Sequence, residues 1–160
     1  MSNKKTTGDS DKTNKIQSQQ KEIDGLYDQI ESSRFDLPML KIAERVLMVP
    51  LVGAVDSVKS QKIMEDVLDS IKPMSLRVVV LDIAGIKVVD SAVAAHLIKI
   101  AKATKLMGCK TIITGISPII SQNIVNLGVD VRDIDTTSTL QDGMQKAYEA
   151  VGLKLVQFNE

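Results

Sequence analysis

The chain has 160 residues, enough for one domain of ordinary size, and its hydrophobic content of 44% allows a substantial core. Because aromatic residues make up only 2%, that core must be built mainly from aliphatic side chains. The formal net charge of +0 and the scarcity of aromatic rings argue against nucleic acid as a partner, since such proteins usually carry a basic face or stacking platforms.

The N-terminal residues are polar. Residues 2–12 contain no large apolar side chain, so we expect residues 1–12 to form a disordered tail. They carry no secretory signal, and no run in the sequence approaches the roughly 18 apolar residues that span a bilayer. Cys109 is the only cysteine, which excludes an internal disulfide and is typical of a reducing compartment. We therefore expect a cytoplasmic protein with no membrane partner.

Residues 13–36 are predicted to form a heptad linker helix. The apolar side chains recur with heptad spacing, with Ile16, Ile23 and Ile30 at position a and Leu26 at position d. Gln19 is a polar d position, and Gly25 weakens the helix. Two interpretations stay open: the seam pairs with a second copy in a homodimer, or the helix folds back on its own domain. Pro38 disfavours a continuing helix, so the folded domain is placed over residues 40–156.

Beyond Pro38, apolar segments alternate with amphipathic ones. Apolar and β-branched runs predict strands at residues 45–51, 52–55, 77–83, 109–114 and 129–131. Helices are expected to begin after Asp56, at Ser91, at Pro118 and at Thr137 or Ser138, and to end at Pro73, Gly108, Gly128 and Gly152. This alternation predicts a compact α/β domain whose mostly parallel sheet has helices packed against it.

The residues give little support for an enzyme. His96 is the only histidine and Cys109 the only cysteine, so the usual zinc ligand sets are excluded. His96 follows Ser91 by about 500° of helix rotation, so the two do not share a face. No glycine-rich phosphate loop occurs, and we expect no cofactor. Cys109 opens an apolar strand and is predicted to be a buried small hydrophobe.

Three aspartates lie near the carboxyl ends of predicted strands: Asp56, Asp82 and Asp90. Ligands of open α/β sheets bind at that edge, so the three carboxylates could hold a cation. Alternatively, they cap helices and accept hydrogen bonds from loop amides, which is the interpretation we favour.

Two segments closely resemble the phosphorylation loop of the STAS (sulphate transporter and anti-sigma antagonist) domain family. They are residues 81–85 (LDIAG) and 88–91 (VVDS), which match a strand ending in Asp followed by Asp-Ser or Asp-Thr at a helix start. The resemblance covers roughly residues 46–151 and includes residues 108–110 (GCK), 115–118 (GISP) and 122–128 (QNIVNLG). The last two motifs are similar to those of the stressosome branch, the RsbR-like and RsbS-like scaffold proteins.

The resemblance implies a STAS fold, with a mostly parallel mixed sheet preceded by a short N-terminal helix, and no catalysis. An RsbT-like serine/threonine switch kinase would phosphorylate Ser91, and a PP2C-type phosphatase would reverse it. Dimers would assemble with an RsbS-like STAS paralogue into a large shell that holds the kinase, and phosphorylation would release it into a stress-response cascade. The partner-binding loop would comprise Asp56, Asp82, Asp90 and Ser117. The alternative is a simple anti-sigma-factor antagonist that binds one anti-sigma kinase.

The sequence departs from the RsbR-like pattern in two places. Too few residues precede Pro38 for the sensory domain that usually comes first in that branch. Asn123 stands where a second phosphorylatable threonine is expected, and Ser121 is a weaker candidate for that role. Ser91 also has a plain structural interpretation as the N-cap of its helix.

Overall fold

The computed structural model describes residues 7–33, 37–128, 131–132 and 134–157, in two units divided after Asp36. The described part of the first unit is one helix, α1 (Thr7–Ser33). It begins before residue 13, so residues 7–12 are helical where the sequence analysis expects a tail, and residues 1–6 lie outside the described residues. Thr, Gly, Ser and Asp fill most of residues 7–12 and have weak intrinsic helix propensity. These residues therefore extend a helix whose better formers, Lys and Gln, lie further along α1. Along α1, Ile16, Ile23 and Leu26 are exposed.

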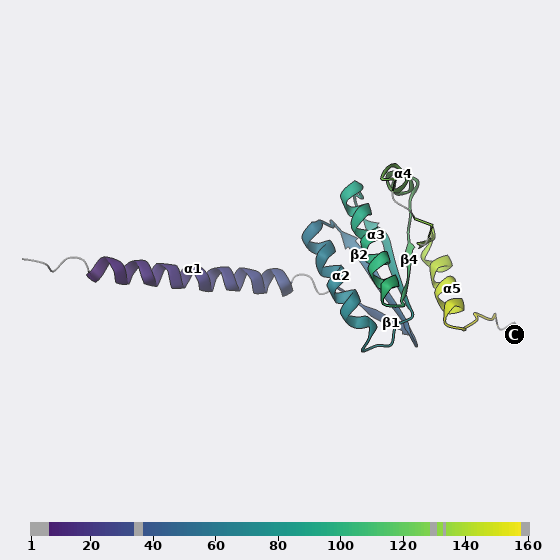
Figure 1. The fold of residues 1–160 in the computed structure, drawn as a ribbon, viewed down its shortest axis with the longest axis horizontal. Helices are drawn as coiled ribbons and strands as arrows, with labels where there is room; N and C mark the ends of the chain where they lie inside the picture. Colours follow the sequence, from purple (N-terminus) through teal and green to yellow (C-terminus); the bar gives the residue numbers. More distant parts are fainter. Residues whose placement is uncertain (1–6, 34–36, 129–130, 133, 158–160) are drawn as a thin grey trace, which may run out of the picture. The chain divides into compact units, whose positions relative to one another are not determined.

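The second unit contains one five-stranded sheet with the strand order β1-β2-β3-β4-β5. The strands are β1 (Leu40–Ala43), β2 (Val46–Gly53), β3 (Val78–Ile86), β4 (Lys110–Thr114) and β5 (Asp135–Thr136). β1 pairs antiparallel with β2, and the other neighbours are parallel. The helices are α2 (Ser57–Ile71), α3 (Ser91–Leu106), α4 (Pro118–Asn126) and α5 (Leu140–Ala150). The predicted α/β fold with a mostly parallel mixed sheet is confirmed (Figure 1). Among the described helices, none is long and apolar enough to cross a membrane.

The first hairpin differs from the sequence prediction. Residues 40–43, where the sequence predicts no strand, form the edge strand β1, and the two strands expected at residues 45–51 and 52–55 are one strand, β2. Pro50 does not break β2, because β1 pairs only with Val46, Leu47 and Met48 and therefore never reaches Pro50. The short β1 is largely exposed, so it lacks the apolar signal of a buried strand.

The last strand is also displaced. A strand is expected at residues 129–131, of which 129–130 lie outside the described residues. The described fifth strand is Asp135–Thr136, which pairs with Ile112 and Ile113 of β4. Two residues are too few to show the alternation of apolar and polar side chains that predicts a strand. This strand forms by pairing with the free edge of β4.

The core is divided between the two faces of the sheet, as strand alternation requires. Leu47, Leu81 and Ile113 point to the face covered by α2 and α3 (Figure 1), and pack with buried residues of those helices. Val80 and Ile112 point to the opposite face, where they pack with Ala147 of α5. The predicted aliphatic core is confirmed.

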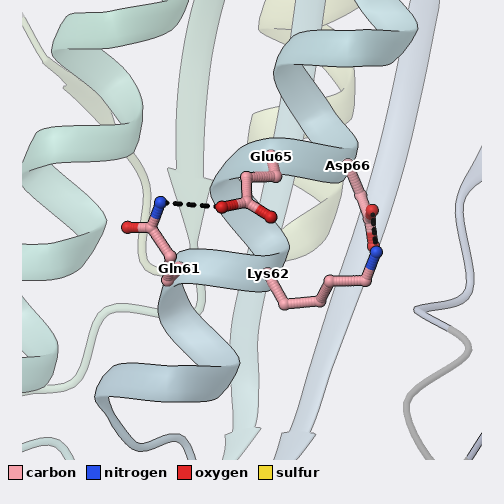
Figure 2. A network of polar contacts seen from close by, with 4 residues as sticks. All are labelled: Gln61, Lys62, Glu65 and Asp66. Atoms are coloured by element: carbon pink, nitrogen blue, oxygen red, sulfur yellow. Dashed lines mark hydrogen bonds and ion pairs between the residues drawn. The ribbon is translucent and has the colours of Figure 1, made fainter. Parts of the chain in front are cut away.

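The outer face of α2 is held by polar pairs one turn apart, shown in Figure 2. Gln61 Nε2 donates to Glu65 Oε1 at 2.9 Å, and Lys62 Nζ lies 2.7 Å from Asp66 Oδ1. The hydrogen bond to the Asp66 carboxylate raises the pKa of Lys62. Such pairs stabilise a helix by only about 0.2–0.5 kcal/mol each, so the buried face of α2 dominates its anchoring.

Candidate functional site

Three loops meet at the carboxyl edge of β2, β3 and β4, and each leads into a helix. Parallel strands with helical crossovers place the following helix N-termini at one edge of the sheet. Asp56 caps α2 by accepting from Lys59 N at 2.7 Å. Ser117 caps α4 by accepting from Ile120 N at 3.3 Å, with Pro118 in the first turn as predicted. Local caps that are recognisable in the sequence therefore fix where these helices begin at the carboxyl edge.

Ser91 is the first residue of α3, and its neighbour Asp90 is the cap. The Asp90 carboxylate accepts from Val93 N at 2.8 Å, and the Asp90 carbonyl accepts from Ala94 N at 3.0 Å. The structural interpretation of Ser91 as the N-cap is therefore wrong. The Ser91 side chain is exposed, and its hydroxyl makes no hydrogen bond within the described part of the chain.

Asp82 does not join Asp56 and Asp90 on the loops. β3 continues to Ile86, so Asp82 lies inside the strand, half-buried, where its carboxylate accepts from Thr114 Oγ1 of β4 at 2.8 Å. Within the described ranges, no group of three His, Cys, Asp or Glu side chains could hold a metal ion. The hydrogen bonds made by the three aspartates match the interpretation that they cap helices and accept hydrogen bonds.

His96 lies on α3 but does not turn toward Ser91. Its Nε2 lies 3.2 Å from Ser57 Oγ, at the start of α2. This contact links the second turn of α3 to the first residue of α2, and it directs the only histidine of the chain away from the exposed serine. The geometry agrees with the sequence argument against a Ser–His pair.

Asn123 is brought to the site by the tertiary structure. Its Nδ2 donates to the carbonyl of Val89 at 2.8 Å, in the loop just before Asp90. In the sequence, this position stands out only because it lacks the threonine expected from the RsbR-like pattern, and no local pattern signals a partner so far away along the chain. Ser121, the weaker candidate for phosphorylation, is exposed on the same helix.

The carboxyl edge also exposes aliphatic side chains, which the sequence analysis did not single out. The exposed fractions are 66% for Val52, 79% for Val58, 72% for Val88 and 70% for Ile119. These residues lie at the end of β2, in the first turn of α2, in the loop before Ser91 and in the first turn of α4. We call these four side chains the apolar rim. Apolar groups gathered around polar caps are typical of protein-binding surfaces.

Cys109 is buried, as predicted, directly before β4. Burial raises the pKa of its thiol to about 11. Because the thiolate is the reactive form, we expect Cys109 in the native protein at pH 8 to react with a disulfide reagent about 100-fold more slowly than in the urea-unfolded chain. Stopped-flow labelling would measure both rates, and equal rates would contradict the burial.

A protein-family model described as the STAS domain matches residues 38–143. The RsbT co-antagonist protein RsbRA of Bacillus subtilis (strain 168) is 40% identical over 123 residues, which cover 77% of this chain and 45% of that protein. The chain therefore spans about half the length of this relative.

Two solved structures resemble the chain closely in fold. One is a variant of RsbS from Moorella thermoacetica, with a TM-score of 0.62 and 26% identity over 74% of this chain and 100% of that one. The other is a chain from a structure of the stressosome, with a TM-score of 0.58 and 28% identity over 71% of this chain and 98% of that one.

Proposed function

The chain belongs to the STAS domain family, and from this premise we propose that it is a non-enzymatic scaffold and phospho-switch of the stressosome type. In this proposal, phosphorylation of Ser91 decides whether a serine/threonine switch kinase is held or released. The similarity to RsbRA, named a co-antagonist of RsbT, supports an RsbT-like kinase as the partner. The output is the regulation of a stress-response cascade in the cytoplasm.

The observation that carries the proposal is the position of Ser91. It is exposed at the first residue of α3, and Asp90 performs the capping that would otherwise occupy its hydroxyl. A serine in this place adds no visible packing or capping to the fold, so its hydroxyl is available to an incoming kinase.

Phosphorylation at this position would change binding with little change in fold. A phosphate adds about −1.5 to −2 charges and three strong acceptor oxygens. The helix N-terminus tolerates that charge, because its amide groups point toward the added phosphate. However, the phosphate would stand beside the Asp90 carboxylate and the exposed Val88 of the apolar rim. A partner that packs on the rim would then face electrostatic repulsion and a desolvation cost.

The proposed assembly is a homodimer that joins an RsbS-like STAS paralogue in a large complex, with a PP2C-type phosphatase reversing the switch. The similarity to RsbS and to a stressosome chain supports the paralogue and the complex. The homodimer is supported by the heptad spacing of α1, whose Ile16, Ile23 and Leu26 are exposed and suited to a second helix. Deleting residues 1–36 should then reduce the oligomer mass measured by light scattering.

The test is phosphopeptide mapping after incubation with ATP and the switch kinase of the same organism. We expect one phosphate on Ser91, absent in Ser91→Ala and retained in Ser121→Ala, the matched exposed serine on α4. In addition, Ser91→Asp should bind the kinase at least about tenfold more weakly than Ser91→Ala, because only the aspartate adds charge beside Asp90. A kinase that is active on another substrate yet leaves Ser91 unmodified, or equal binding of the two variants, would refute the switch.

A further inference from the structure

We propose that Asn123 is a positioning residue through which α4 holds the loop that presents Ser91. This inference rests on the proposed function for its consequence, but the contact itself is independent of that function. The Asn123 amide donates to the Val89 carbonyl at 2.8 Å, and so joins α4 to the peptide group directly before the cap residue Asp90.

The loop needs such a contact because it has few others. Residues 88–90 belong to no helix or strand. At the start of the loop, Lys87 N donates to the Gly53 carbonyl at 3.3 Å. At its end, the Val89 side chain is 7% exposed and packs in the core, whereas Val88 is 72% exposed. The Asn123 bond supplies the Val89 carbonyl with a donor and fixes the plane of the Val89–Asp90 peptide.

The orientation of the Val89–Asp90 peptide affects the position of Ser91 through the helix cap. Asp90 caps α3 through its carboxylate and its carbonyl, to Val93 N and Ala94 N respectively. A cap works only with its backbone in an extended conformation, and Asp90 has φ −86° and ψ −180°. The hydrogen bond from Asn123, which comes from another helix, restrains Val89, the residue before the cap. Losing this bond would loosen the cap residue Asp90 and the first helical residue, Ser91.

The helix at the other end of the contact, α4, follows a loop whose backbone packs tightly on β3. The helix itself buries few side chains. Gly115, just before α4, lies so close to Ala84 that a Cβ there would meet Ala84 N at 2.5 Å. Yet Ile120 is the only buried residue of α4, and Ile119 and Val125 are largely exposed. A partner that displaced α4 through those side chains would therefore alter how Ser91 is presented.

The experiment compares Asn123→Ala and the isosteric Asn123→Asp, which has no amide donor, with Asn126→Ala as a matched change of an exposed asparagine on the same helix. Native-state amide exchange by NMR should show Val93 and Ala94 exchanging about fivefold faster in both Asn123 variants, the size expected from one hydrogen bond. The equivalent amides of α2, Lys59 and Ser60, which are bonded to Asp56, serve as the internal control and should not change.

The second readout is Ser91 phosphorylation by the switch kinase. A loosened serine should lower kcat/KM about fivefold through kcat, with KM little changed, because Val52, Val58 and Ile119 of the apolar rim lie outside the loosened loop. Unchanged exchange at Val93 and Ala94 in both folded Asn123 variants, or an equal increase in Asn126→Ala, would overturn the inference. If the wild-type chain is not phosphorylated on Ser91, the proposed function fails, while the exchange measurement still decides whether Asn123 holds the loop.

Discussion

Replacing Gly115 by alanine is expected to destabilise the folded domain by about 3–5 kcal/mol. Gly115 has a φ of +79°, which an L side chain adopts only with strain. The added Cβ would also lie 2.5 Å from Ala84 N and 2.8 Å from Ala84 Cα, and backbone atoms cannot rotate away. The free energy of unfolding from urea titration, monitored by far-UV circular dichroism, would measure the loss.

Gly108→Ala is the matched control that separates backbone strain from the steric clash of residue 115 with Ala84. Gly108 has a similar φ of +75° after α3, but a Cβ there would meet nothing within 4 Å. It should cost only about 1 kcal/mol, which is the backbone strain alone. Equal losses in the two variants would contradict the role of the Gly115–Ala84 contact. A larger loss for Gly115→Ala would show that the loop before α4 packs tightly against the end of β3.

Replacing Gly143 by alanine is expected to cost about 2–4 kcal/mol, although alanine favours helices by about 1 kcal/mol over glycine. Gly143 is buried in α5, and a Cβ there would overlap with Thr114 Cγ2. Since Thr114 is fully buried in β4, its methyl group cannot swing into solvent, and α5 must move off the sheet. The measurement is again the free energy of unfolding.

Thr114→Ser provides the matched background for this test. Serine keeps the hydroxyl that donates to Asp82 and removes the methyl group that Gly143 meets. In that background, Gly143→Ala should cost at least about 1 kcal/mol less, with the remainder reflecting Thr137 Oγ1, which a Cβ would meet at 3.1 Å. Strict additivity of the two changes would contradict the steric explanation.

The helices around the site could be predicted because their signals are local. An N-cap lies within one turn of the amides that it serves, so Asp56-Ser57, Asp90-Ser91 and Ser117-Pro118 mark three helix starts in the sequence alone. Even so, the assignment of roles within one pair required coordinates. Asp90 and Ser91 are both good caps, and only the backbone shows that Asp90 takes the role and leaves Ser91 exposed.

The central strands of the sheet were predictable from the sequence, and the edge strands were not. The continuous apolar run at residues 77–83 indicated a buried parallel strand, and β3 (Val78–Ile86) is that strand. Edge strands lie against one neighbour only and need no apolar pattern on both faces, so β1 was missed and the last strand was misplaced. Pro50 suggested a break for the same reason, because its tolerance depends on where the edge strand β1 ends.

The alternation of strands and helices, the aliphatic core and the serine at a helix start can be read from the amino acids alone, because each depends on periodicity or on neighbours within one turn. The folded domain was needed to show that Asn123 bonds Val89, that Asp82 bonds Thr114 and that Gly115 lies against Ala84. These contacts join residues about 30 positions apart. Such contacts form only after the parallel strands have brought their carboxyl ends to one edge, and a side chain shows no local sign of a partner that folding places beside it.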